Sequence, residues 1–127
     1  MTRRLTIALL TACVPVSASA AAASPLPVST FLAKVSGLKK KGPLALFSGD
    51  IKLLMNQVKQ DSAQLRAENK ALEAAGKRKH YCAPEKSSLK DKDLLAALEQ
   101  VPVAQRPRTS TKEAFRAYLA RRFPCKV

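Results

Sequence analysis

Two cysteines, Cys82 and Cys125, constrain the fold of this chain more than any other feature. Each lies just outside a segment of helical periodicity, because Cys82 precedes residues 88–100 and Cys125 follows residues 111–123. Each helix has about 13 residues and would therefore be about 20 Å long. Joined by a short loop, the two helices would fold back antiparallel. We therefore predict a helix hairpin whose open end brings the two cysteines together.

The beginning of the chain predicts export, which favours a disulfide between these cysteines. Two arginines at positions 3–4 precede a short apolar run over residues 5–16, and residues 18–20 fit the small-residue cleavage pattern of a secretory signal. The apolar run is too short to span a bilayer as a helix. We expect residues 1–20 to be a signal peptide cleaved near Ala20, which would give a periplasmic or secreted protein.

A second interpretation of this leader stays open. The tetrapeptide Leu10-Thr11-Ala12-Cys13 resembles a bacterial lipoprotein box. It would place a lipid on Cys13 and hold the protein at a membrane. In an exported chain the two remaining cysteines are expected to pair. Closing a loop of about 44 residues would stabilise the fold by about 4 kcal/mol on the chain-entropy model.

Two earlier segments also have helical periodicity. The first, residues 29–41, begins at Ser29 or Thr30 as N-cap and stops at Gly42-Pro43. Its apolar face holds Phe31, Leu32, Val35 and Leu38.

The second segment, residues 50–75, is the longest of the chain, with Ser48 or Asp50 as its N-cap. We expect its first half to pack firmly through Ile51, Leu54, Met55 and Val58. The acidic residues Asp61 and Glu68 fall on the second position of the seven-residue repeat and argue against a dimeric coiled coil. Its second half has a thinner stripe, which leaves open a bend near residues 60–62 or a helix end that projects from the core.

These patterns define the fold class. The last two helices carry Leu94, Leu95 and Leu98, and Phe115, Tyr118 and Leu119, and no stretch shows sustained strand alternation. Ser88 is the expected N-cap of the first, and Ser110 with Glu113 forms a capping box at the start of the second. We predict an all-α, small four-helix domain over residues 29–127 with a C-terminal antiparallel helix hairpin closed by one disulfide. Residues 21–28 are expected to be a flexible lead-in.

The sequence offers little for catalysis or metal binding. A zinc site needs about four ligands, and beyond the two cysteines the chain has one histidine, His80, and no CxxC motif. A catalytic thiolate would need a separate histidine base, whereas His80 lies two residues from Cys82 and Cys125 can oxidise the thiol. We expect no cofactor, no metal and no enzyme activity.

The charge of the mature chain points to acidic partners. Without the leader the chain has 21 basic and 9 acidic residues, a net charge of about +12. A basic surface attracts nucleic acid, anionic envelope material or an acidic protein, and export argues against nucleic acid. A simpler interpretation is that the long basic side chains only keep the helices in solution.

The C-terminal part of the chain also resembles a known family. Residues 81–84, Tyr-Cys-Ala-Pro, and residues 123–125, Phe-Pro-Cys, enclose two helices in the pattern of the Tai immunity proteins of type VI secretion amidase effectors. The resemblance covers residues 81–125 and implies a small helical periplasmic protein, often a homodimer, that binds a peptidoglycan amidase. The first half of the chain departs from the family pattern, because it has no mature cysteine before Cys82.

The expected function is therefore that of an exported immunity or inhibitor protein whose protein partner is an amidase effector. Its candidate contact residues are basic or lie beside basic residues in two loops: Lys77, Arg78, Lys79, His80, Tyr81, Arg106 and Arg108. The alternative for Tyr81, as for Tyr118, is a packing role. One alternative is a basic cell-envelope accessory protein that binds an anionic polymer or lipid. Another is a small periplasmic chaperone.

Overall fold

The computed structural model describes residues 25–87 and 89–126, and these residues form a helical domain. Four α-helices and two 3-10 segments follow one another, and the described residues include one isolated bridge and no strand. The elements are α1 Val28–Lys41, η1 Gly42–Phe47, α2 Gly49–Ala74, α3 Asp91–Glu99, η2 Val103–Gln105 and α4 Thr111–Arg122. The predicted all-α, four-helix class is confirmed. The predicted signal peptide, Cys13 and the Ser88 N-cap lie outside the described residues.

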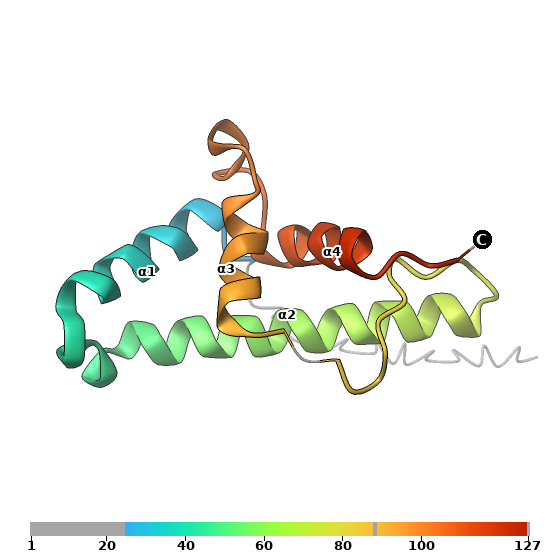
Figure 1. The fold of residues 1–127 in the computed structure, drawn as a ribbon, viewed down its shortest axis with the longest axis horizontal. Helices are drawn as coiled ribbons and strands as arrows, with labels where there is room; N and C mark the ends of the chain where they lie inside the picture. Colours follow the sequence, from blue (N-terminus) through green and yellow to red (C-terminus); the bar gives the residue numbers. More distant parts are fainter. Residues whose placement is uncertain (1–24, 88, 127) are drawn as a thin grey trace, which may run out of the picture.

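Helix α2 is the long base on which the other elements are arranged (Figure 1). Helix α1 contacts the first half of this base and α4 lies along its second half, while α3 packs against α4. With 26 residues, α2 is about 39 Å long. Its two ends are therefore far apart.

Local chemistry explains where the longest helix begins. The hydroxyl of Ser48 accepts a hydrogen bond from the backbone N–H of Asp50 at 3.3 Å, which satisfies one of the free donors at the helix start. The Asp50 carboxylate also pairs with Lys34 of α1 at 2.7 Å. One of the two predicted caps, Ser48, is thus the N-cap, and Asp50 joins α2 to α1.

The core lies where the four helices meet. Its buried residues come from every α-helix and from the segment after α2: Val28, Phe31, Leu54, Leu65, Tyr81, Ala97, Leu98, Ala114 and Phe115. Burying such apolar side chains is the main favourable contribution to folding. Helix α4 begins at the predicted capping box, in which Ser110 and Glu113 bond each other's backbone N–H groups at 2.9 and 3.2 Å.

Two expectations about the first half of the chain are wrong. Helix α1 begins at Val28 with Pro27 as its N-cap and without a side-chain cap, not at Ser29 or Thr30. Met55 is exposed, whereas its neighbour Leu54 is buried in the core. For the second half of α2 the sequence left a bend or a projecting end open; the helix runs unbroken to Ala74, and α4 lies along it (Figure 1).

The described part of the lead-in is also more ordered than expected. Backbone N–H groups of Val28 and Thr111 donate to the carbonyls of Thr109 and Leu26, both at 2.9 Å. These two bonds join the chain before α1 to the chain before α4. The expected flexible lead-in is therefore wrong for its last residues, and residues 21–24 lie outside the described range.

The predicted disulfide is confirmed, but its setting differs from the expected one. Cys82 lies in an irregular segment well before Asp91, where α3 begins. The bond therefore connects the end of α4 to the segment that leaves α2. Helices α3 and α4 contact each other, yet Figure 1 shows them crossing steeply. The hairpin is confirmed only as a contact between consecutive helices.

Candidate functional site

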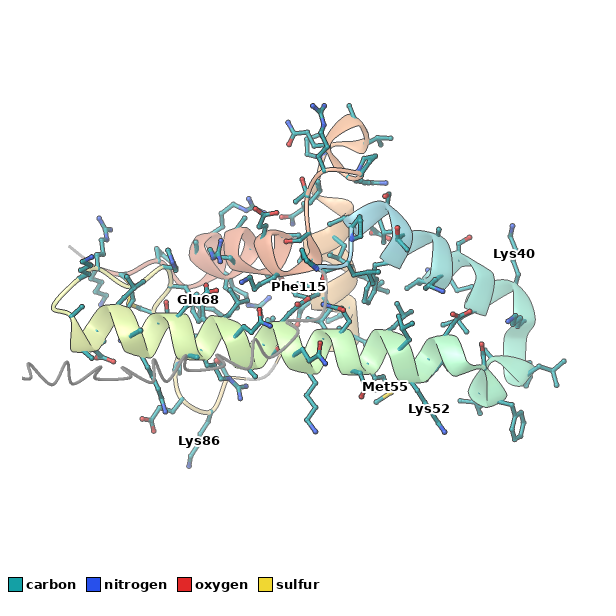
Figure 2. The ribbon with its side chains drawn as sticks, turned by 180° about the vertical axis from the view of Figure 1, so that it is seen from behind. Lys40, Lys52, Met55, Glu68, Lys86 and Phe115 are labelled. Carbon is teal, nitrogen blue, oxygen red and sulfur yellow. A yellow bond between two sulfur atoms is a disulfide. The ribbon has the colours of Figure 1, made fainter. Side chains whose placement is uncertain are left out.

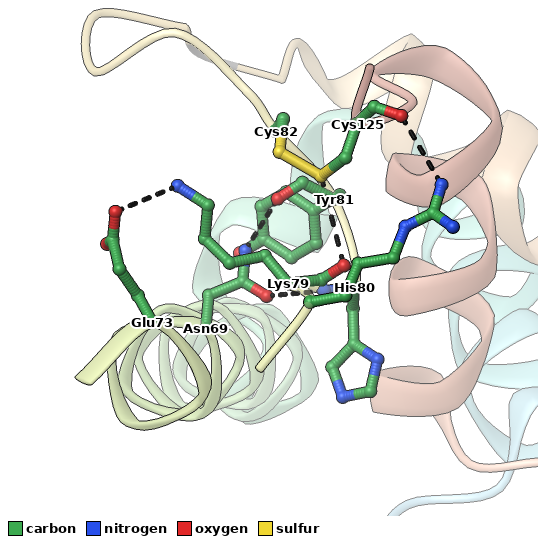
Figure 3. The surroundings of a disulfide bond; sticks show 8 residues. Asn69, Glu73, Lys79, His80, Tyr81, Cys82 and Cys125 are labelled. Atoms are coloured by element: carbon green, nitrogen blue, oxygen red, sulfur yellow. Dashed lines mark hydrogen bonds and ion pairs between the residues drawn. A yellow bond between two sulfur atoms is a disulfide. The ribbon is translucent and has the colours of Figure 1, made fainter. Parts of the chain in front are cut away.

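The disulfide holds a basic loop, residues 76–82, against the end of α4 (Figure 3). The Cα atoms of Cys82 and Cys125 are 4.9 Å apart, within the range that a disulfide requires. Next to the bond, the backbone N–H of Cys82 donates to the carbonyl of Phe123 at 2.8 Å. One covalent bond and one hydrogen bond thus fix the end of the loop to α4.

Glycine at position 76 starts the loop. Gly76 has φ 67°, a conformation that residues with a Cβ rarely adopt. Its N–H donates to the carbonyl of Glu73 at 3.0 Å, and the N–H of Lys77 donates to Leu72 at 2.8 Å. This pair of bonds is a Schellman motif, which ends α2 and sets the direction in which the basic loop leaves it.

Asn69 holds the middle of the basic loop. This buried residue of α2 donates from its amide nitrogen to the carbonyl of Tyr81 at 2.9 Å, and its amide oxygen accepts from the N–H of His80 at 3.0 Å. The Tyr81 ring is itself buried in the core, and burial raises the pKa of its phenol. The loop is therefore fixed at its start by the Schellman motif and further along by Asn69 and the disulfide, and Figure 3 shows the last two.

The remaining side chains of the basic loop face solvent. Lys77, Arg78 and His80 are exposed, and Arg78 also reaches the carbonyl of Cys125 at 3.4 Å. Lys79 is half-buried and pairs with Glu73 at 3.4 Å. A held backbone thus presents two full positive charges and an imidazole, groups that bind carboxylates.

A depression of about 500 Å³ adjoins the basic loop. Its wall combines apolar and charged side chains: Glu68, Ala71, Leu72, Ala75, Lys77, His80 and Arg116. The apolar members come from the last turns of α2, and the cations stand at the edge and on α4. Such a surface suits a side chain that has an aliphatic stem and an acidic end.

The structure brings only some of the predicted contact residues together. Tyr81 belongs to the core, so its side chain is absent from the exposed surface. Arg106 donates to the backbone carbonyls of Val101 and Glu99, both at 2.9 Å, and so ends α3. Arg108 is exposed, but the loop that carries it lies away from residues 77–81 (Figure 1). The two predicted loops therefore do not form one surface.

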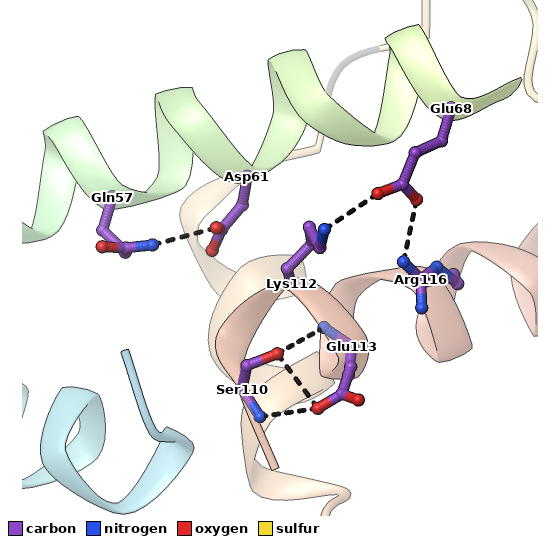
Figure 4. A network of polar contacts seen from close by, with 7 residues as sticks. All are labelled: Gln57, Asp61, Glu68, Ser110, Lys112, Glu113 and Arg116. Carbon is purple, nitrogen blue, oxygen red and sulfur yellow. Dashed lines mark hydrogen bonds and ion pairs between the residues drawn. The ribbon is translucent and has the colours of Figure 1, made fainter. Parts of the chain in front are cut away.

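A polar network joins α2 and α4, the two helices to which the basic loop is fixed (Figure 4). The buried Asp61 carboxylate accepts from the Thr111 hydroxyl at 2.5 Å and from Gln57 at 2.9 Å. Glu68 accepts from Lys112 and Arg116, both at 2.8 Å. The acidic residues that argue against a coiled coil thus form the polar seam between two helices of one chain.

The Glu68 pair predicts a dependence of stability on pH. The Lys112 ammonium, with the Arg116 guanidinium, holds the pKa of Glu68 below its usual value. A carboxyl with a lowered folded-state pKa stabilises the fold above its unfolded pKa of about 4.3 and loses this contribution as the pH falls through the folded value. We expect Glu68→Gln to lower the free energy of unfolding by about 1 kcal/mol at pH 7, because the pair is partly exposed, and by less at pH 3, because protonation of Glu68 weakens the pair.

Urea denaturation of both chains at the two pH values measures this difference. Glu73→Gln is the matched control, because Glu73 forms a longer and more exposed pair with Lys79. An equal loss for Glu68→Gln at pH 7 and pH 3 would contradict the assignment.

A cleft of about 570 Å³ lies on the other side of the polar seam, between α2 and the loop before α4. Of its charged members, Asp61, Lys112, Glu113 and Arg116 are already engaged in the bonds of Figure 4, whereas Arg108, one of the predicted contact residues, is exposed. It therefore offers fewer available charges than the basic loop.

Within residues 25–87 and 89–126, no group of three or more His, Cys, Asp or Glu side chains is placed to hold a metal ion.

An apolar surface at the far end of α2 was missed from the sequence. Leu44, Leu46 and Phe47 of η1 are largely exposed. The run of apolar residues between two predicted helices, residues 43–47, was the available signal, but in the sequence such a run cannot be told from a buried connection.

No helix in the described part of the chain is long and apolar enough to cross a membrane. Comparison with protein families, curated proteins and solved structures found no match.

Proposed function

We propose that the chain is an exported, non-catalytic inhibitor of the immunity type, which binds a protein partner through the basic loop. The observation that carries this proposal is the attachment of the loop at three points. Gly76 sets its direction, Asn69 holds its middle, and the disulfide fixes its end, while Lys77, Arg78 and His80 remain exposed. Binding through a preorganised loop avoids the entropy cost of ordering it in the complex.

The side chains of the basic loop indicate which kind of surface the partner would present. Two basic side chains and an imidazole beside a depression with apolar and charged walls fit a cleft with acidic residues at its mouth. The resemblance of residues 81–125 to amidase immunity proteins supports a peptidoglycan amidase as the class of partner. In that role the loop would cover the cleft of the enzyme.

Binding of the purified chain to exported peptidoglycan amidases of the same cell, measured by calorimetry, tests the proposal. The variant Lys77→Glu/Arg78→Glu should bind at least about 100-fold more weakly, because like charges would then face each other. The control variant Lys39→Glu/Lys40→Glu carries the same change of charge on exposed residues of α1 and should bind like the wild type. Absence of binding to every such amidase, or equal loss in both variants, would reject the proposal.

A second candidate function is that of a basic envelope accessory protein, and one observation favours it. Lysines surround the exposed apolar residues at the other end of α2, far from the basic loop. Such a protein would bind anionic material whether or not an amidase is present.

A further inference from the structure

The connection between α1 and α2 forms an exposed apolar tip, defined by Leu44, Leu46, Phe47 and Met55. The exposed fractions of the first three are 71%, 77% and 89%, and Met55 is exposed beside them on α2. Only Ala45 of this 3-10 segment is buried. Large apolar side chains clustered at one place on a small domain mark an interaction surface.

The geometry of η1 explains why these side chains point outward together. Gly42, with φ 55°, ends α1, and Pro43 supports a short 3-10 segment rather than a continued helix. In a 3-10 helix, side chains three residues apart lie on the same side, so Leu44 and Phe47 share one face. Within η1, Ala45 is the one residue whose side chain is buried.

Lysines surround the tip. Lys39, Lys40 and Lys41 end α1 and Lys52 lies in the first turns of α2, and all four are exposed. Figure 2 shows Lys40, Lys52 and Met55 at the same end of the molecule. From residue 39 to residue 59 the one acidic residue is Asp50, and it is paired with Lys34. The tip therefore combines apolar side chains with a local excess of positive charge.

We propose that this tip docks on an anionic phospholipid bilayer, with Leu44 and Phe47 entering the acyl boundary and the lysines contacting the headgroups. An apolar surface with basic flanks is the pattern of interfacial membrane binding, and each lysine near an anionic surface contributes favourably. A soluble polyanion would bind the lysines but would give no role to the exposed Phe47. A two-fold dimer through the tip would bring the same four lysines against their copies, which repels.

The proposal gives α2 a geometric role. The tip and the basic loop lie at opposite ends of this helix (Figure 1), separated by about 39 Å. Docking of the tip would direct the basic loop away from the bilayer. The inference stands apart from the inhibitor proposal, because either surface can fail its test while the other passes.

A single tryptophan at the tip tests the inference, because the chain has none of its own. The variant Phe47→Trp, in the full exported chain, should emit at the wavelength of a water-exposed indole in buffer. With phosphatidylglycerol-containing vesicles its emission should shift to shorter wavelength, and brominated lipids should quench it. The control Val103→Trp, at an exposed site of η2, should show neither change. The reporter reads position 47 itself, so membrane attachment through another part of the chain leaves it unchanged.

Two further variants separate the apolar and charged contributions. Leu44→Ser/Phe47→Ser should weaken binding to these vesicles at least about tenfold, and Lys39→Glu/Lys40→Glu should do so more than Lys77→Glu/Arg78→Glu. Phosphatidylcholine vesicles should give no shift in the Phe47→Trp chain. An unshifted emission with anionic vesicles would overturn the inference, as would a shift that depends only on protein concentration, which indicates a dimer. Binding that survives loss of both apolar residues would also overturn it and indicate a polyanion site.

Discussion

Replacing both Cys82 and Cys125 by serine is expected to lower the free energy of unfolding by about 4 kcal/mol. The bond closes a loop with a sequence separation of 43 residues, which spans α3, η2 and α4. Without it the unfolded chain regains the freedom that the bond removes. For a domain of about 100 residues such a loss corresponds to a fall in Tm of about 15–30 °C.

Guanidinium denaturation of the oxidised wild type and the double-serine variant measures this loss. Wild-type chain treated with a reductant is the matched control and should fall to the stability of the variant. A loss below about 1 kcal/mol would show that the 76–82 and 123–126 segments stay together without the bond.

Phe115→Ala is the second large effect that we expect, because Phe115 is only 2% exposed at the centre of the core. Truncating a buried phenylalanine removes its transfer free energy and leaves a cavity, at a cost of about 3–5 kcal/mol. Phe47→Ala makes the same chemical change at a side chain that is 89% exposed. It should alter stability by no more than about 0.5 kcal/mol.

The same denaturation experiment compares the two alanine variants. A chain that loses equal stability at positions 47 and 115 would contradict the arrangement of the core. A large loss at Phe47 alone would show that the tip is packed in the free protein, and would thereby also weaken the membrane proposal.

Local sequence patterns predicted the parts of this fold that local chemistry decides. The Ser110–Glu113 capping box, the Ser48 cap and the length of α2 each depend on residues within one or two helical turns. The cysteine pair was predictable because the expected export favours a disulfide and two cysteines follow the predicted leader. What the sequence did not predict is the angle at which α3 crosses α4, since this depends on side chains from distant parts of the chain.

The polar seam shows most clearly why the rest could not be predicted. In a heptad count, Asp61 and Glu68 fall on a position that a coiled coil needs to be apolar, and acidic residues are seldom buried. Their partners Thr111, Lys112 and Arg116 lie 44 to 50 positions further along the chain. Only the packing of α4 on α2 brings them together. In the sequence the acidic residues therefore appeared to interrupt the apolar stripe of α2, although they form its polar contacts with α4.

The candidate site was predicted in part for the same reason. A run of basic residues before a cysteine indicated the loop over residues 77–81, and three of its members are exposed. Of the two roles that the sequence left open for Tyr81, the structure shows packing in the core. The sequence could not show that Arg106 is used to end α3. The sequence also could not show that Leu44, Leu46 and Phe47 are exposed, because apolar composition alone does not distinguish a buried connection from an exposed one.

The central claim is that the basic loop is held in one conformation before any partner binds. Hydrogen exchange of the backbone amides of His80 and Cys82 tests it most directly, because these N–H groups donate to Asn69 and Phe123. In the oxidised free protein we expect both amides to exchange as slowly as those in the middle of α2, through a shared opening of the domain. Exchange at the rate of an unprotected amide, with the disulfide intact, would contradict the account.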